Sequence, residues 1–286
     1  MLSVVFIHGL TGHRENTWTS PTATDPWPKS LLPARISNVR VLTFGYDATI
    51  ADWRSILSNN IVGNHAQDLL NALADLRGED DSNARPIIFV CHSIGGLVCE
   101  YALVSSSQHP EKHLRAVSQS TKGIIFLGTP HHSPGLAVRA ERLCGSIGIL
   151  WQVDLSTIRV LRQDSEVLSR TQDSFHTMIQ SRNSGDRRPV EITCFYEELL
   201  TSTVGIIVPQ ESAMLPGYRS IGIRSNHQDM TKFASPEEAG FMAICAEIQR
   251  WVKEMSPLTA VCEAGFRGHR SSQTFQWRGG ETNSIL

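Results

Sequence analysis

The chain has 286 residues, of which 41% are hydrophobic and 19% are charged, so it has ample material for a large globular core. Its 26 Lys and Arg residues are balanced by 28 Asp and Glu residues. Because this composition offers no basic excess to neutralise phosphates, it argues against a nucleic-acid partner.

The cellular compartment is suggested by three features of the sequence. The N-terminal apolar run is short and has no basic segment before it, unlike a secretory signal peptide. No later stretch contains the ~18 consecutive apolar residues of a membrane-spanning helix. The six cysteines are scattered, without the spacing of a zinc site or the density of a disulfide scaffold. We therefore expect an intracellular, cytoplasmic protein, with peripheral contact to a mitochondrial or endoplasmic reticulum membrane left open.

Short runs rich in β-branched residues recur along the chain and are typical of β-strands. Three of them are apolar on both faces, as in central strands of a parallel sheet that helices cover on both sides. Their alternation with helical patterns predicts an α/β fold with a mostly parallel, doubly wound sheet. The predicted strands are Val4–Ile7, Val39–Phe44, Ile87–Val90, Gly123–Leu127, Ile192–Phe195 and Tyr218–Ile223.

Helical periodicity is clearest in Asn64–Leu76 and in Glu237–Met255, where apolar residues recur every three or four positions. Residues 135–188 carry further helical stripes and no strand pattern, so we expect a helical insertion there that caps the site. The last segment is rich in Gly, Ser and Arg and has no periodicity. We therefore predict one domain over residues 1–256 and a disordered tail over residues 257–286.

A serine stands at the turn between a predicted strand and a predicted helix. The strand ending at Val90 continues into Cys91-His92-Ser93-Ile94-Gly95-Gly96, and a helix is expected to begin at Leu97. This context is typical of a nucleophile elbow, usually written G-x-S-x-G, although Cys91 replaces the first glycine. A simple helix N-cap is the alternative role, but a cap needs neither the preceding histidine nor the pair of glycines. We therefore predict that Ser93 is a nucleophile.

A serine nucleophile needs a histidine to accept its proton and an acid to orient that histidine. On a hydrolase sheet of this type, the order along the chain is serine, acid, histidine. Of eleven histidines, only His227 and His269 follow the strand that ends near Tyr196, and His269 lies in the predicted tail. The order of the chain therefore predicts His227 as the base.

The acid is expected at the carboxyl end of the preceding strand, where Glu197 and Glu198 are adjacent. Neighbouring residues on a strand point to opposite faces, so only one of them can face the histidine. We predict Glu197, with Glu198 second and Glu211 as a third candidate.

The same chemistry needs two backbone N–H groups to stabilise the oxyanion. One comes from the residue after the nucleophile, which is Ile94, and the other from the loop after the first strand, which points to Leu10. The sequence His8-Gly9-Leu10-Thr11-Gly12 follows that strand directly, and its glycines allow the backbone to approach a substrate closely.

His131 and His132 are adjacent in a loop, and adjacent histidines do not easily share one metal ion. We therefore interpret them as part of the pocket rim and predict no metal site. No phosphate-binding glycine motif follows any predicted strand, so no nucleotide cofactor is expected.

As a set, these motifs resemble the lipase-like α/β-hydrolases of the serine-active-site (phosphatidylglycerol-remodelling) and GPI inositol-deacylase type. Similar domains stand at the N-terminus of fungal NOD-like receptors. The resemblance covers about residues 2–255 and implies the α/β-hydrolase fold, with Ser93, Glu197 and His227 as the triad. The chain departs from the family pattern near the pocket at Leu199-Leu200-Thr201 and at His132. The motifs that carry the resemblance are Phe6-Ile7-His8-Gly9-Leu10, Phe44-Gly45-Tyr46-Asp47, the elbow, Gly128-Thr129-Pro130-His131, Phe195-Tyr196-Glu197-Glu198, Val208-Pro209-Gln210-Glu211-Ser212-Ala213 and Asn226-His227.

The first hypothesis is therefore a serine hydrolase that cleaves or transfers an acyl group from a small-molecule or lipid-like ester or thioester through an acyl-enzyme. A soluble esterase, thioesterase or acyltransferase of a metabolic pathway is the second. The third is a non-catalytic signalling module, which has no need for a serine, an acid, a histidine and an oxyanion loop together. The oligomeric state is not determined by the sequence.

Overall fold

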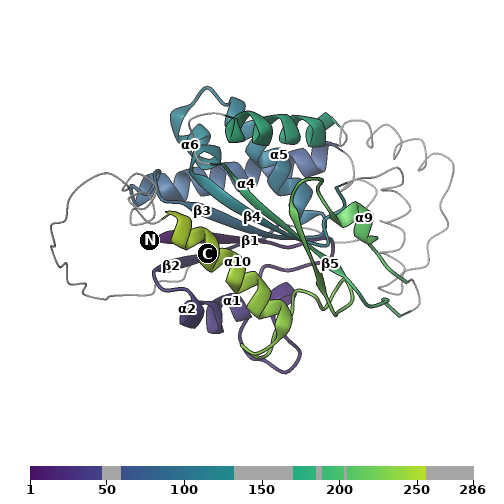
Figure 1. The fold of residues 1–286 in the computed structure, drawn as a ribbon. Coiled ribbons are helices and arrows are strands. Elements are labelled where there is room, and N and C mark those ends of the chain that lie inside the picture. The colour runs from purple at the N-terminus through teal and green to yellow at the C-terminus, as the bar shows by residue number, and fades with distance from the viewer. Residues whose placement is uncertain (47–58, 132–169, 185–188, 203–204, 256–286) are drawn as a thin grey trace, which may run out of the picture.

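The computed structural model describes residues 1–46, 59–131, 170–184, 189–202 and 205–255 (Figure 1). Its centre is a six-stranded sheet in the order β2-β1-β3-β4-β5-β6, in which every neighbouring pair is parallel. The strands are β1 (Leu2–Ile7), β2 (Val39–Phe44), β3 (Ile87–His92), β4 (Thr121–Leu127), β5 (Glu191–Glu197) and β6 (Arg219–Ile223). All six predicted strands are confirmed, and the predicted doubly wound sheet is wholly parallel.

Helices cover both faces of the sheet (Figure 1). Alternating residues of each strand supply the two cores: Val5 and Ile7 of β1 face one, and Val4 and Phe6 face the other. The first core is covered by α4 (Asn59–Glu79), α5 (Gly95–Gln108), α6 (Lys112–Ser120) and a helical segment over 170–183. The second is covered by α1 (Trp27–Ser30), α2 (Leu32–Arg35) and α10 (Ala239–Met255). The short η1 (Asn16–Trp18) and α9 (Gln210–Ala213) lie in loops.

The helical periodicity predicted at the C-terminal side is confirmed in α10. Phe241, Ile244, Ile248 and Trp251 recur on one face and are at most 1% exposed. The boundaries differ modestly from those predicted: α10 begins at Ala239, α4 extends beyond Asn64–Leu76 at both ends, and α5 begins at Gly95 instead of Leu97. Helix α6 was not predicted, because its apolar face is only two turns long.

Most of the predicted cap over 135–188 and all of the predicted tail lie outside the described residues. The main described part of the cap, the helical segment over 170–183, packs against the body of the protein. Phe175 is 1% exposed and meets Phe126 of β4 edge to face, with the ring centroids 6.4 Å apart. In the portions of the chain that the structure covers, no helix is long and apolar enough to cross a membrane.

Candidate active site

The candidate catalytic residues gather at the carboxyl edge of the sheet, where β3, β4, β5 and β6 end. Two backbone hydrogen bonds tie these ends together: Ser93 N–H donates to the Leu127 carbonyl at 2.9 Å, and Gly128 N–H donates to the Phe195 carbonyl at 2.8 Å. Crevices outside the carboxyl ends of parallel strands are where open α/β sheets form their sites.

Ser93 occupies a strained backbone conformation between β3 and α5. Its φ is +53°, in the left-handed region that costs a residue with a side chain about 1 kcal/mol or more. The side chain is 1% exposed, and its hydroxyl makes no hydrogen bond to any of the described residues. The elbow predicted from the sequence is therefore present, with an unpartnered hydroxyl at its apex.

The loop after β1 lies directly across this elbow. A Cβ on Gly9 would stand 2.6 Å from the Ser93 Cβ, and one on Gly95 would stand 2.3 Å from the His8 carbonyl oxygen, so neither position has room for a side chain. The two N–H groups predicted to bind an oxyanion, those of Leu10 and Ile94, make no hydrogen bond within the described ranges.

Glu197 and His227 meet as a buried pair beside the elbow. His227 Nδ1 lies 2.8 Å from Glu197 Oε2, and neither side chain is exposed to solvent. The other carboxylate oxygen, Oε1, accepts hydrogen bonds from the backbone N–H groups of Ile207 and Val208, the second at 3.0 Å. These donors fix the position of the carboxylate.

His92, which precedes Ser93 in the elbow, connects the elbow to the loop that carries His227. Its Nε2–H donates to the His227 carbonyl at 2.9 Å, and the two rings are 4.9 Å apart. Burial lowers the pKa of His92 well below its usual value, and the nearby His227 lowers it further, so His92 is neutral. The His227 Nε2 is buried without a hydrogen-bond partner among the described residues, so Ser93 and His227 are not hydrogen-bonded here.

The two alternative acids are placed differently. Glu198 is exposed and lies over Gly222 of β6, and Glu211 is exposed in α9. Of the three candidates, the structure brings only Glu197 to His227. His269, the other histidine considered, lies outside the described residues.

Cys91, which replaces the first glycine of the elbow motif, is fully buried. Its side chain packs against Cys99 of α5, where burial and a hydrogen bond to Cys91 raise the pKa of the Cys99 thiol well above its usual value. A second small side chain on the helix therefore makes room for a cysteine at a position that usually requires glycine.

A second buried carboxylate–histidine pair was not predicted. His131 Nδ1 lies 2.7 Å from Glu100 Oε1 of α5, and His131 Nε2 lies 4.0 Å from the Cys194 sulfur. His131 is 1% exposed and its ring lies between Glu100 and Cys194, contacts that our interpretation of it as pocket rim did not anticipate; His132 lies outside the described residues. A single charged residue at position 100, within an otherwise apolar helix face, was the available sequence signal for this pair.

Over the described ranges, no group of three or more His, Cys, Asp or Glu residues is placed to bind a metal.

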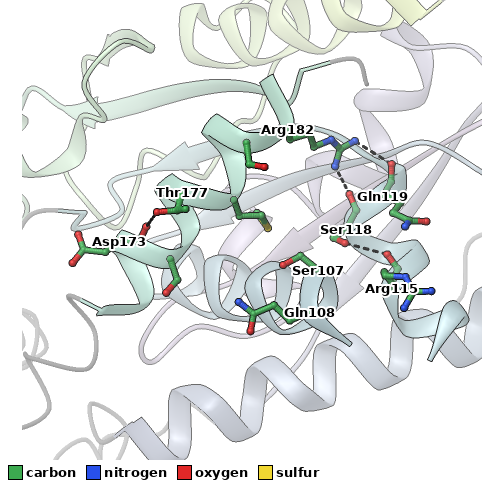
Figure 2. A pocket seen from close by; sticks show the side chains of 11 residues that line it. Ser107, Gln108, Arg115, Ser118, Gln119, Asp173, Thr177 and Arg182 are labelled. Carbon is green, nitrogen blue, oxygen red and sulfur yellow. Dashed lines mark hydrogen bonds between the residues drawn. The ribbon is translucent and has the colours of Figure 1, made fainter. Parts of the chain in front are cut away.

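A separate cavity of about 1000 Å³ lies between α5, α6 and the helical segment over 170–183 (Figure 2). Its two arginines donate to backbone carbonyls: Arg182 to Thr121 at 2.7 Å and Arg115 to His109 at 2.7 Å. None of the candidate catalytic residues lines this cavity.

Comparison with known proteins relates the chain to one family. Residues 4–190 match the model of the Alpha/beta hydrolase family. Protein SERAC1 of Bos taurus is 30% identical over 251 residues, which is 80% of this chain and 36% of that protein. Protein SERAC1 of Danio rerio is 33% identical over 154 residues, covering 47% of this chain and 22% of that protein. The chain thus spans about a third or less of the length of these relatives.

Among solved structures, the mature lipase BlEst2 of Bacillus licheniformis superposes with a TM-score of 0.53 at 18% identity. The match covers 85% of this chain and 91% of that structure. At this identity, the likeness establishes a common fold.

Proposed function

The chain belongs to the alpha/beta hydrolase family, and on this premise we propose that it is a serine hydrolase acting on an ester or thioester through an acyl-enzyme. The proposal rests on one observation: the buried Glu197–His227 pair, with its Nδ1 to Oε2 distance of 2.8 Å, stands beside the strained elbow that presents Ser93. Both the Ser93 hydroxyl and the His227 Nε2 are left without partners among the described residues.

In the proposed mechanism, Ser93 Oγ attacks the substrate carbonyl carbon while His227 Nε2 accepts the hydroxyl proton. The Glu197 carboxylate stabilises the imidazolium through Nδ1–H. The N–H groups of Leu10 and Ile94 bind the oxyanion. The intermediate then expels the alcohol or thiol, which takes the proton from His227 and leaves an acyl group on Ser93. Water or another acceptor then attacks the acyl carbonyl and gives its proton to His227, which returns the proton to Ser93 Oγ as the acyl group leaves. The distance between serine and histidine is expected to shorten when substrate binds.

We propose a lipid-like acyl group as the substrate class. The lipase name of the Bacillus licheniformis structure supports this choice, as do the apolar stripes predicted over 135–188, most of which lie outside the described residues. Burial of each substrate CH₂ contributes about 0.8 kcal/mol, so kcat/KM is expected to rise severalfold with each of the first few methylenes.

The test is a series of p-nitrophenyl esters from acetate to palmitate, measured with the wild type and with Ser93→Ala. We expect Ser93→Ala to lose activity by a factor on the order of 10⁶, while Ser107→Ala, at the far end of α5, keeps wild-type rates. Equal activity of Ser93→Ala and the wild type would refute the serine mechanism. A steep fall in kcat/KM beyond butyrate would instead favour a small-ester or pathway-specific enzyme and refute the lipid-like substrate alone.

A further inference from the structure

The peptide between Gly9 and Leu10 is held from its carbonyl side. The Gly9 carbonyl oxygen lies 2.9 Å from His8 Nδ1 and accepts a hydrogen bond from Gly12 N–H at 3.0 Å. In a trans peptide the C=O and N–H bonds point in opposite directions. Fixing the Gly9 carbonyl therefore fixes the direction of the Leu10 N–H, the group proposed to bind the oxyanion.

His8 is in turn held by Tyr46, which follows β2. The two rings are stacked, with centroids 4.3 Å apart and an angle of 7° between the planes. The Tyr46 hydroxyl donates to the His8 carbonyl at 2.8 Å, and the Tyr46 backbone N–H donates to His8 Nε2 at 3.3 Å. Tyr46 thus contacts the ring, the carbonyl and the Nε2 atom of a single residue.

These bonds define one tautomer of His8. Because Tyr46 N–H donates, Nε2 is an acceptor, so the ring proton is on Nδ1, where it donates to the Gly9 carbonyl. Burial lowers the pKa of His8, which keeps the ring neutral. Burial of the Tyr46 hydroxyl raises its pKa, so it remains a donor.

From this chain of contacts we infer that Tyr46 and His8 are positioning residues for the oxyanion site, acting through the Gly9–Leu10 peptide. The inference rests on the proposed function, because it assigns the Leu10 N–H a role in that reaction. A donor that must meet a developing charge gains from being fixed before the reaction, and small misplacements cost large factors in rate. Neither residue touches the substrate carbonyl in this scheme.

The experiment compares Tyr46→Phe, which keeps the stacked ring and removes the hydroxyl, with Tyr218→Phe, which removes a hydroxyl that contacts Asn183 far from the elbow. We expect Tyr46→Phe to lower kcat for p-nitrophenyl butyrate by about tenfold to hundredfold, with KM within twofold of the wild type. The inhibition constant of a trifluoromethyl ketone, which mimics the oxyanion, should rise by the same factor as kcat/KM falls. Tyr218→Phe should change neither quantity.

A second pair of variants tests the Nδ1 bond. Asn places an N–H near the position of the His Nδ1, so His8→Asn should retain more of kcat than His8→Leu. The inference is overturned if Tyr46→Phe has the wild-type kcat or if only KM changes. It is also overturned if the fall in kcat equals the fall in the fraction of protein that a fluorophosphonate labels, because the variant would then contain fewer active molecules and not a slower active site. If Ser93→Ala remains active, the proposed function itself fails and this inference fails with it. An inactive Ser93→Ala beside a fully active Tyr46→Phe refutes the positioning role alone.

Discussion

Two buried carboxylate–histidine pairs, Glu197–His227 and Glu100–His131, have nearly equal N to O distances of 2.8 and 2.7 Å. Their surroundings differ. His227 stands beside the elbow with its Nε2 unpartnered among the described residues, whereas the Nε2 of His131 faces the Cys194 sulfur inside the core. The pairing of a histidine with an acid therefore does not identify a catalytic base. The pairs also differ in geometry: His131 and Glu100 are hydrogen-bonded, whereas His227 Nδ1 and Glu197 Oε2 lie 2.8 Å apart without forming a well-directed hydrogen bond. Under the proposed mechanism, the two histidines are distinguished by the group that the second ring nitrogen can reach.

The largest expected difference between the pairs is in catalysis. Glu197→Gln should lower kcat by up to about 10⁴, the scale seen when a triad acid is neutralised, because the imidazolium loses its counter-charge. Glu100→Gln should leave kcat within a few-fold, provided that both are measured well below the melting temperature. Steady-state ester hydrolysis by the two variants decides between the assignments. Comparable losses in both would remove the distinction between a catalytic and a structural pair.

The structural pair should instead appear in the pH dependence of stability. Burial alone lowers the pKa of His131, but the Glu100 carboxylate, with a contribution from Cys194, outweighs it and raises the pKa to about 9. The unfolded value is about 6.5. Since the folded state binds the proton more tightly, the stabilisation is complete below about pH 6.5 and is lost as the pH rises through about 9.

Urea unfolding between pH 6.5 and 9.5 measures this effect. We expect the free energy of unfolding to fall by about 3 kcal/mol more in the wild type than in His131→Gln. The variant corrects for thiols such as Cys99, whose raised pKa also reduces stability at high pH. Parallel curves for the two proteins would show that His131 is not held in its charged form.

A smaller effect is expected from the link between the elbow and His227, the proposed catalytic base. His92→Phe removes the hydrogen bond to the His227 carbonyl and should lower kcat about tenfold by loosening the loop that carries His227. The exposed His113 provides a control, since His113→Phe should retain the wild-type rate. An unchanged kcat in His92→Phe would mean that the loop is fixed by its other contacts.

The smallest effect should come from the neighbour of the acid. Glu198 is exposed and its carboxylate lies over Gly222 of β6, so Glu198→Gln should keep kcat within about threefold of the wild type. Ester hydrolysis by Glu198→Gln and Glu197→Gln, measured side by side, tests the strand register. A larger loss from Glu198→Gln would show that the acid has been assigned to the wrong residue.

The sequence was sufficient to predict the sheet and the candidate residues because both depend on local patterns. Apolar runs of β-branched residues predicted all six strands. The order of serine, acid and histidine restricted the candidate base to the histidines after the fifth strand, and of these only His227 lies outside the predicted tail. The choice of Glu197 followed from strand alternation, and the structure places that residue, and neither alternative, beside His227.

The Glu100–His131 pair and the Tyr46–His8 contact could not be predicted in the same way. Each joins residues more than 30 positions apart, in elements whose relative placement depends on the packing of the whole sheet. No local periodicity encodes which helix residue meets which loop. The glutamate at position 100 indicated only that a charge would be buried. That His131 is its partner became evident only from the structure.

The central claim, that Ser93 is the nucleophile, is tested most directly by locating a covalent adduct. A fluorophosphonate should label the folded protein at one site, and mass spectrometry of the digest should find the adduct on the peptide that contains Ser93. Labelling should be absent in Ser93→Ala and strongly slowed in His227→Gln, which lacks the base. An adduct on another residue, or equal labelling of Ser93→Ala, would contradict the account.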